Sequence, residues 1–184
     1  MSQLNYFMDE QNYEDLAKRH PDLFQKSGLE YFSIGNGWVG IVDTLCSFIS
    51  YDVNQARYKL KYAMEHQGEQ YAVPIPEAEK RLEEALAELP IIEDVKEKFG
   101  GLRFYVRSAS DKIYNYIEFA EALSHRTCEE CGAPGERRAG GWIKTLCDTH
   151  HKNRKGILGD VDDYDDDEPL TAAPTQLAPK IADE

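Results

Sequence analysis

The sequence predicts an α+β fold, with a small helical body, a β-hairpin, a compact C-terminal module and an acidic tail. Helical periodicity dominates the first 90 of the 184 residues, and a period of two flanks a Gly-Gly pair near residue 100. Beyond residue 158 the composition becomes acidic and proline-containing. We therefore expect a body at 1–127, a module at 128–158 and a tail at 159–184.

Five segments place hydrophobic residues at helical spacing. Pro21 is expected to end the first segment and Pro90 the fourth, because proline lacks the amide that a helix interior requires. Ser110 is a candidate N-cap for the fifth. The predicted helical segments are 13–17, 38–49, 52–66, 77–89 and 111–126.

Residues 91–107 have a strand pattern instead. Polar and apolar residues alternate imperfectly before Gly100-Gly101, and residues 102–106 are rich in β-forming types. We expect a β-hairpin that turns at the two glycines. Lys96, Lys98 and Arg103 would form a basic strip on it beside Phe104 and Tyr105, an arrangement suited to stacking of RNA or DNA bases. Because Glu93, Asp94 and Glu97 interrupt the strip, an ordinary solvated sheet face is the preferred interpretation.

Four residues near the C-terminus have the spacing of a zinc site. Cys128 and Cys131 form a CxxC pair, and after 15 residues Cys147 and His150 form a CxxH pair. Three thiolates and one imidazole fill the four tetrahedral positions of a structural zinc ion, whereas a catalytic zinc keeps one position for water. His151 is an alternative fourth ligand, and unmetallated thiols or a disulfide are alternatives to zinc. Cys46 lies in an apolar run and is assigned to the core.

The segments around these ligands suggest a treble-clef-like zinc finger holding one structural Zn²⁺. Gly132 permits the first pair to turn tightly, and glycines at 135, 140 and 141 punctuate a short hairpin. The second pair would open a final helix, for which Thr145 is a candidate cap. The expected order is a tight turn around Cys128 and Cys131, called the knuckle, then the hairpin and then the helix.

The net charge of −13 is concentrated in the tail. Residues 159–184 contain nine acidic residues and one lysine. This composition favours a disordered segment, and the alternative is an acidic arm that docks on a basic host surface. The acidic residues concerned are Asp160, Asp162, Asp163, Asp165, Asp166, Asp167 and Glu168.

Neither a transmembrane helix nor a signal peptide is predicted. The chain has no apolar run of about 18 residues, and its first residues lack a basic region followed by an apolar segment. We therefore expect a cytoplasmic protein with no membrane partner. The cytoplasm is a reducing environment, which keeps zinc-binding thiols in the reduced form.

An ordered set of motifs resembles a family of small proteins found in phages and bacteria. The motifs are HPDLF (20–24), GNGW (35–38), VKEKFGGLRFYV (95–106), CEECGAPG (128–135) and GWIKTLCDTHH (141–151). The resemblance implies an α+β body with a treble-clef-like zinc site and a phage origin, and it carries over no activity. The acidic tail lies outside the family pattern.

These features predict a non-enzymatic, zinc-stabilised protein that binds a host macromolecule, with a host protein as the preferred partner. The alternative is a nucleic-acid-binding zinc-finger module. Its candidate contacts are Arg137, Arg138, Lys144, Lys152, Arg154 and Lys155. A metal-dependent HNH-like nuclease is less favoured, because such enzymes resemble one another in placing an Asp-His pair between the zinc pairs, and residues 132–146 contain neither residue type.

Overall fold

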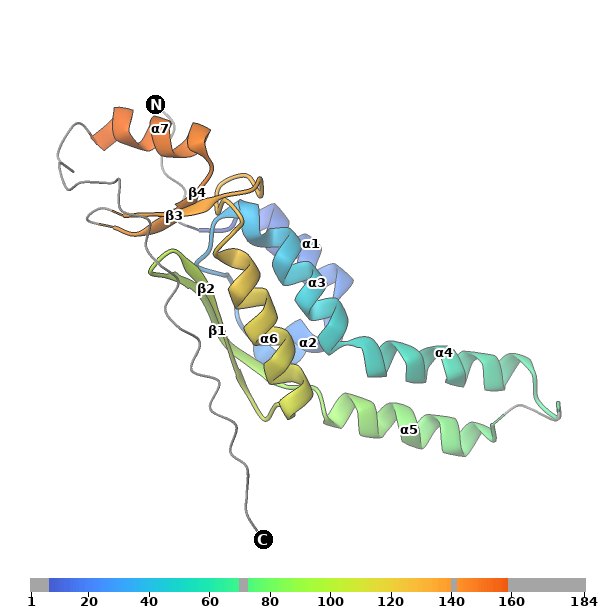
Figure 1. The fold of residues 1–184 in the computed structure, drawn as a ribbon. Coiled ribbons are helices and arrows are strands. Elements are labelled where there is room, and N and C mark those ends of the chain that lie inside the picture. The colour runs from blue at the N-terminus through green and yellow to red at the C-terminus, as the bar shows by residue number, and fades with distance from the viewer. Residues whose placement is uncertain (1–6, 70–72, 140–141, 159–184) are drawn as a thin grey trace, which may run out of the picture.

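A computed structural model describes residues 7–69, 73–139 and 142–158 (Figure 1). This part of the chain contains seven α-helices, one 3-10 helix and two antiparallel hairpins, which confirms the α+β prediction. The elements are α1 (Glu10–Arg19), α2 (Pro21–Ser27), η1 (Asn36–Trp38), α3 (Val39–Ile49), α4 (Tyr51–Glu65), α5 (Ile75–Ala87), β1 (Ile91–Lys98), β2 (Gly101–Arg107), α6 (Asp111–Ser124), β3 (Glu136–Arg138), β4 (Lys144–Leu146) and α7 (Asp148–Leu158).

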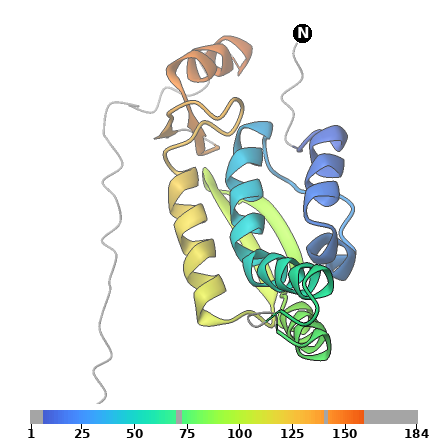
Figure 2. The same cartoon turned by 90° about the vertical axis from the view of Figure 1, so that its right-hand side faces the viewer.

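The core lies between the β1–β2 hairpin and the helices on one of its faces. Helix α6 packs on β2, α3 packs on α6, and α2 packs on β1 (Figures 1 and 2). Trp38, Phe32 and Leu102 are fully buried between these layers. Ser33 pairs with the free edge of β1. Its amide donates to the carbonyl of Val95, and its carbonyl accepts from the amide of Glu97, both at 2.8 Å. The other face of the hairpin is not covered by these helices (Figure 1).

Helices α4 and α5 form an arm that projects from this body (Figure 1). Buried alanines at 56, 63 and 78 let the two helices approach closely. The arm turns away from the C-terminal module, which lies at the opposite end of the molecule.

Four local predictions need correction. Pro21 follows the end of α1, as expected, but it also begins α2, which was not predicted. Proline is well suited to the first helical position, so it can begin one helix just after another has ended. The hairpin turns at Phe99-Gly100, one residue earlier than expected, since Gly101 already pairs with Lys98. Ser110 takes the N-cap position of α6 as predicted, but its side chain makes no capping bond. Thr145 lies in β4 and caps no helix.

Two further expectations concern the tail and the membrane. The acidic residues of the tail lie outside the described residues. In the described part of the chain, no helix has the length and apolar character needed to cross a bilayer.

Candidate metal centre

The four predicted ligand residues come together at the end of the molecule occupied by β3, β4 and α7. Cys128 and Cys131 lie in the loop between α6 and β3, Cys147 follows β4, and His150 lies in the first turn of α7. Their ligand atoms all lie within 4.8 Å of one another, the one such grouping of three or more candidate ligands among the described residues.

The distances between these atoms fit a tetrahedral zinc site. Zinc bonds of about 2.3 Å to sulfur and about 2.0 Å to nitrogen imply tetrahedral edges of about 3.8 Å between two sulfurs and about 3.5 Å between sulfur and nitrogen. The Sγ atoms of Cys131 and Cys147 lie 3.9 Å apart. Nδ1 of His150 lies 3.5 Å from Sγ of Cys128 and 3.3 Å from Sγ of Cys147. The group is therefore compatible with one zinc ion, and His150 supplies the nitrogen that faces the thiols.

The backbone around the first two cysteines forms a tight turn that aims both thiols inward. The amide of Gly132 donates to the carbonyl of Cys128 at 2.8 Å, and the amide of Cys128 donates to Ala133 at 2.8 Å. Gly132 has a φ of 75°, a left-handed conformation that glycine adopts without steric cost. The predicted knuckle is thus present.

The thiols differ in their electrostatic surroundings. The backbone N–H of His150, at the start of α7, lowers the pKa of Cys147 to about 7. Burial raises the pKa of Cys128. Because zinc binds thiolates, the lowered pKa favours metal binding by Cys147.

The GNGW segment holds the knuckle against the body. The amide of Gly37 donates to the carbonyl of Glu129 at 2.8 Å, and the indole of Trp38 donates to the carbonyl of Thr127 at 2.7 Å. A Cβ at Gly37 would lie 2.5 Å from the amide nitrogen of Gly132, and a Cβ at Gly35 would overlap the carbonyl of Glu129. Both glycines are required because the two backbones touch.

The β1–β2 turn holds the module from the other side. The hydroxyl of Thr145 donates to the carbonyl of Gly100 at 2.5 Å, and the indole of Trp142 donates to the carboxylate of Glu97 at 3.1 Å. Gly101 leaves no room for a side chain, since an added Cβ would lie 2.9 Å from Nε2 of His125. The GNGW segment, the β1–β2 turn and the two ligand pairs therefore meet around the candidate metal centre.

The predicted basic cluster does not form one exposed surface. Arg137 and Lys152 are exposed, but Lys144 and Arg154 are buried. Lys144 forms an ion pair with Glu129, and Arg138 is half-buried and bonds to Asp148 at 2.5 Å. The side chain of Lys155 lies outside the described part. Spacing alone did not show that Lys144 is buried, together with the other two residues of β4.

Together the fold and this centre define an α+β protein with a candidate Cys3His zinc site. Comparison of the chain with family models, curated proteins and solved structures finds no match.

Proposed function

We propose that this chain is a zinc-stabilised, non-enzymatic binding protein whose C-terminal module is a treble-clef-like zinc finger. The observation that carries the proposal is the closed Cys3His set, in which protein atoms supply all four ligands and no position remains for a reacting water. Structural zinc contributes on the order of 10 kcal/mol to the folding of such modules. Zinc thus stabilises the folded C-terminal module as part of the surface that would meet a partner.

The preferred partner is a host protein in the cytoplasm, in line with the phage origin implied by the family resemblance. Support comes from an apolar groove of about 480 Å³ between α3 and α6. No charged residue lines it, and the rings of Phe48 and Phe119 on its walls are 50 % and 69 % exposed. Exposed aromatic side chains contribute little to folding, whereas buried aromatic anchors dominate protein interfaces.

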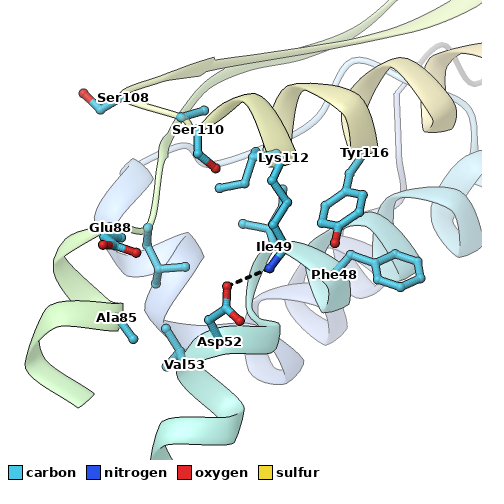
Figure 3. Close-up of a pocket in the computed structure, with 13 residues that line it drawn as sticks. Phe48, Ile49, Asp52, Val53, Ala85, Glu88, Ser108, Ser110, Lys112 and Tyr116 are labelled. Carbon is cyan, nitrogen blue, oxygen red and sulfur yellow. Dashed lines mark hydrogen bonds and ion pairs between the residues drawn. The ribbon is translucent and has the colours of Figure 1, made fainter. Parts of the chain in front are cut away.

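A second pocket of about 390 Å³ continues the groove toward α4 and α5 (Figure 3). Phe48 and Tyr116 belong to both hollows, and their rings pack with centroids 5.3 Å apart. At this end the ammonium of Lys112 bonds to the carboxylate of Asp52 at 2.9 Å (Figure 3). A partner would therefore meet an apolar centre with a polar group at one end, the arrangement typical of a specific interface. The acidic tail is proposed as an additional arm for the same partner.

A pull-down from host lysate tests this function. The baits are the zinc-loaded full-length chain, a chain truncated after Gly159, and a groove variant that combines Phe119→Ala with Leu123→Ala. Tyr58→Ala is the matched control, because Tyr58 is 67 % exposed on the arm and does not line the groove.

Loss of one host protein from the groove variant alone would assign binding to α3 and α6, and loss from the truncated chain alone would assign it to the tail. Recovery of no specific protein by any bait would contradict the proposal. Nucleic acid in place of protein would favour the second candidate, a nucleic-acid-binding module. DNA hydrolysis restored by magnesium or manganese at constant zinc would favour the nuclease.

A further inference from the structure

Two aromatic side chains are held in solvent where the β1–β2 turn meets the zinc module. Phe99 is 61 % exposed and Trp142 is 55 % exposed. Arg137 donates to the carbonyl of Phe99 at 3.0 Å, and Glu97 accepts from the indole of Trp142 at 3.1 Å and from the amide of Gly100 at 2.7 Å. Hydrogen bonds thus hold the backbone and the indole N–H of this tip in place, while the two rings remain exposed to solvent.

The identity of residue 99 is not explained by the fold. Phe99 and Gly100 have φ values of 53° and 72°, so both turn residues have the left-handed backbone that favours Asn-Gly in a two-residue hairpin. A bulky residue in this region costs conformational energy, and the ring recovers little of it because most of its surface stays in water. An exposed aromatic residue at a strained turn is typical of a recognition site.

The groups beside these rings are mostly basic. The ammonium of Lys98 lies 5.5 Å from the ring centroid of Phe99, and no ion pair of Lys98 is present among the described residues. Along β1 the next ammonium, that of Lys96, lies 5.2 Å from the Tyr105 ring. The guanidinium groups of Arg137 and Arg103 also lie close to His125 beside the turn, where, after burial, they contribute to lowering its pKa.

The nearby carboxylates are already engaged. Asp94 forms an ion pair with Lys96 at 2.5 Å, and both oxygens of Glu97 accept the hydrogen bonds described above. The sequence alone suggested that these acids would interrupt a basic strip. In the structure Asp94 pairs with Lys96, whereas Glu97 orients Gly100 and Trp142 and keeps its own negative charge. The tip therefore presents two aromatic faces beside the ammonium of Lys98 and the guanidinium of Arg137, with one carboxylate among them.

We infer that this tip, formed by Phe99, Trp142, Lys98 and Arg137, binds single-stranded nucleic acid. Unpaired bases stack on exposed aromatic rings irrespective of sequence, and neighbouring basic groups meet the phosphates. This activity goes beyond the proposed protein binding and uses different residues from the groove between α3 and α6. The tip shares Arg137 with the basic cluster predicted from sequence and Lys98 with the hairpin strip, and it adds the two exposed rings of Phe99 and Trp142.

Tryptophan fluorescence tests the inference directly. The chain has two tryptophans, and Trp38 is fully buried, so quenching by an added oligonucleotide reports on Trp142. The zinc-loaded full-length protein is titrated at low salt with oligo(dT), oligo(U) and a DNA duplex. Saturable quenching by the single strands, weaker for the duplex and diminished by salt, is expected. The two single strands show whether DNA or RNA is preferred.

The decisive variant is Phe99→Asn. Asparagine suits a positive φ, so the thermal midpoint should stay the same or rise while affinity for the single strand falls about 5- to 100-fold. Combining Lys98→Gln with Arg137→Gln should weaken binding and reduce its salt dependence. The control Phe119→Ala removes a ring on α6 that is at least as exposed as that of Phe99, and it should leave affinity for the single strand unchanged.

Three results would overturn the inference: no saturable binding at low salt, unchanged affinity in Phe99→Asn, or equal loss of affinity in Phe119→Ala. The outcome is independent of protein binding, because the lysate partner should be kept by Phe99→Asn and lost by the groove variant. A host protein lost from Phe99→Asn in the pull-down would assign the tip to protein recognition instead.

Discussion

Lys144 and Glu129 form a buried ion pair that joins β4 to the knuckle of the candidate metal centre. Their side chains are 6 % and 2 % exposed, and the ammonium of Lys144 contacts Oε1 of Glu129. The backbone amide of Glu129 also donates to the carbonyl of Thr145 at 3.0 Å. The segments that carry the two halves of the candidate ligand set are therefore joined independently of any metal.

Removing one charge of this pair should destabilise the protein strongly. Lys144→Met leaves the Glu129 carboxylate buried without its counter-charge, and breaking a buried pair in this way costs about 3–5 kcal/mol. The double change Glu129→Met and Lys144→Met should recover most of that loss, because two apolar side chains replace two desolvated charges. Urea unfolding of the zinc-loaded Lys144→Met protein and of the double variant measures both effects. A double variant that is as unstable as Lys144→Met, or less stable, would contradict this explanation.

Gly37→Ala should disturb the docking of the knuckle. The added methyl would overlap the carbonyl of Cys128 and lie 2.7 Å from the amide nitrogen of Cys131. We expect a loss of about 1–3 kcal/mol or more in the free energy of unfolding, together with weaker zinc retention against a chelator.

Gly40→Ala is the matched control for that change. Gly40 lies in α3, and an added Cβ would meet nothing within 4 Å. This substitution should be neutral or stabilise by up to about 1 kcal/mol. If both alanine variants unfold at the same denaturant concentration as the parent, the close approach at Gly37 has no energetic role.

Cys131→Ser should release zinc and unfold residues 128–158, while the body keeps its core. Serine is a poor zinc ligand, and a three-ligand site retains much less of the binding energy that stabilises the module. Metal content by mass spectrometry and amide hydrogen exchange along the chain measure the two effects. Cys46→Ala is the control, because Cys46 is buried in the body, away from the candidate ligands. This variant should keep one zinc per chain. A Cys131→Ser protein with full metal content and unchanged exchange would show that the assigned ligand set is incorrect.

His125 should make the protein less stable in mild acid. Burial, followed by the charges of Arg137 and Arg103, lowers the pKa of this imidazole in the folded state below its ordinary value of 6.5. The unfolded chain therefore binds a proton before the folded one does. The stabilisation is complete above about pH 6.5 and is lost as pH falls toward the folded pKa.

The measurement compares urea unfolding of the parent and His125→Asn at pH 7.5 and 5.5 in zinc-containing buffer. Asparagine does not titrate, so the variant should lose less stability between the two pH values. Zinc release in acid affects both proteins alike, and the difference between them isolates His125. Equal losses would show that its protonation is not coupled to folding.

Much of the local structure followed from short-range patterns. Trp38, Ile41 and Leu45 lie at helical spacing because a helix must present one face to the core, and they are buried in the structure. The ligand spacing of Cys128, Cys131, Cys147 and His150 was equally readable, since a metal needs its donors at short, regular separations. The α2 helix was missed because Pro21 both ends one helix and begins the next.

The tertiary structure determined which motifs contact one another. Nothing in the spacing of Gly35 and Gly37 shows that the knuckle lies against them, because that contact joins segments about 90 residues apart along the chain. Lys144 looked like a surface cation until its burial opposite Glu129 was known. Sequence alone determined most of the helices, the presence of the hairpin and the four candidate metal ligands, which depend on near neighbours. The three-dimensional fold determined which glycines touch backbone, which charges are buried and which rings stay in solvent, since each depends on distant segments.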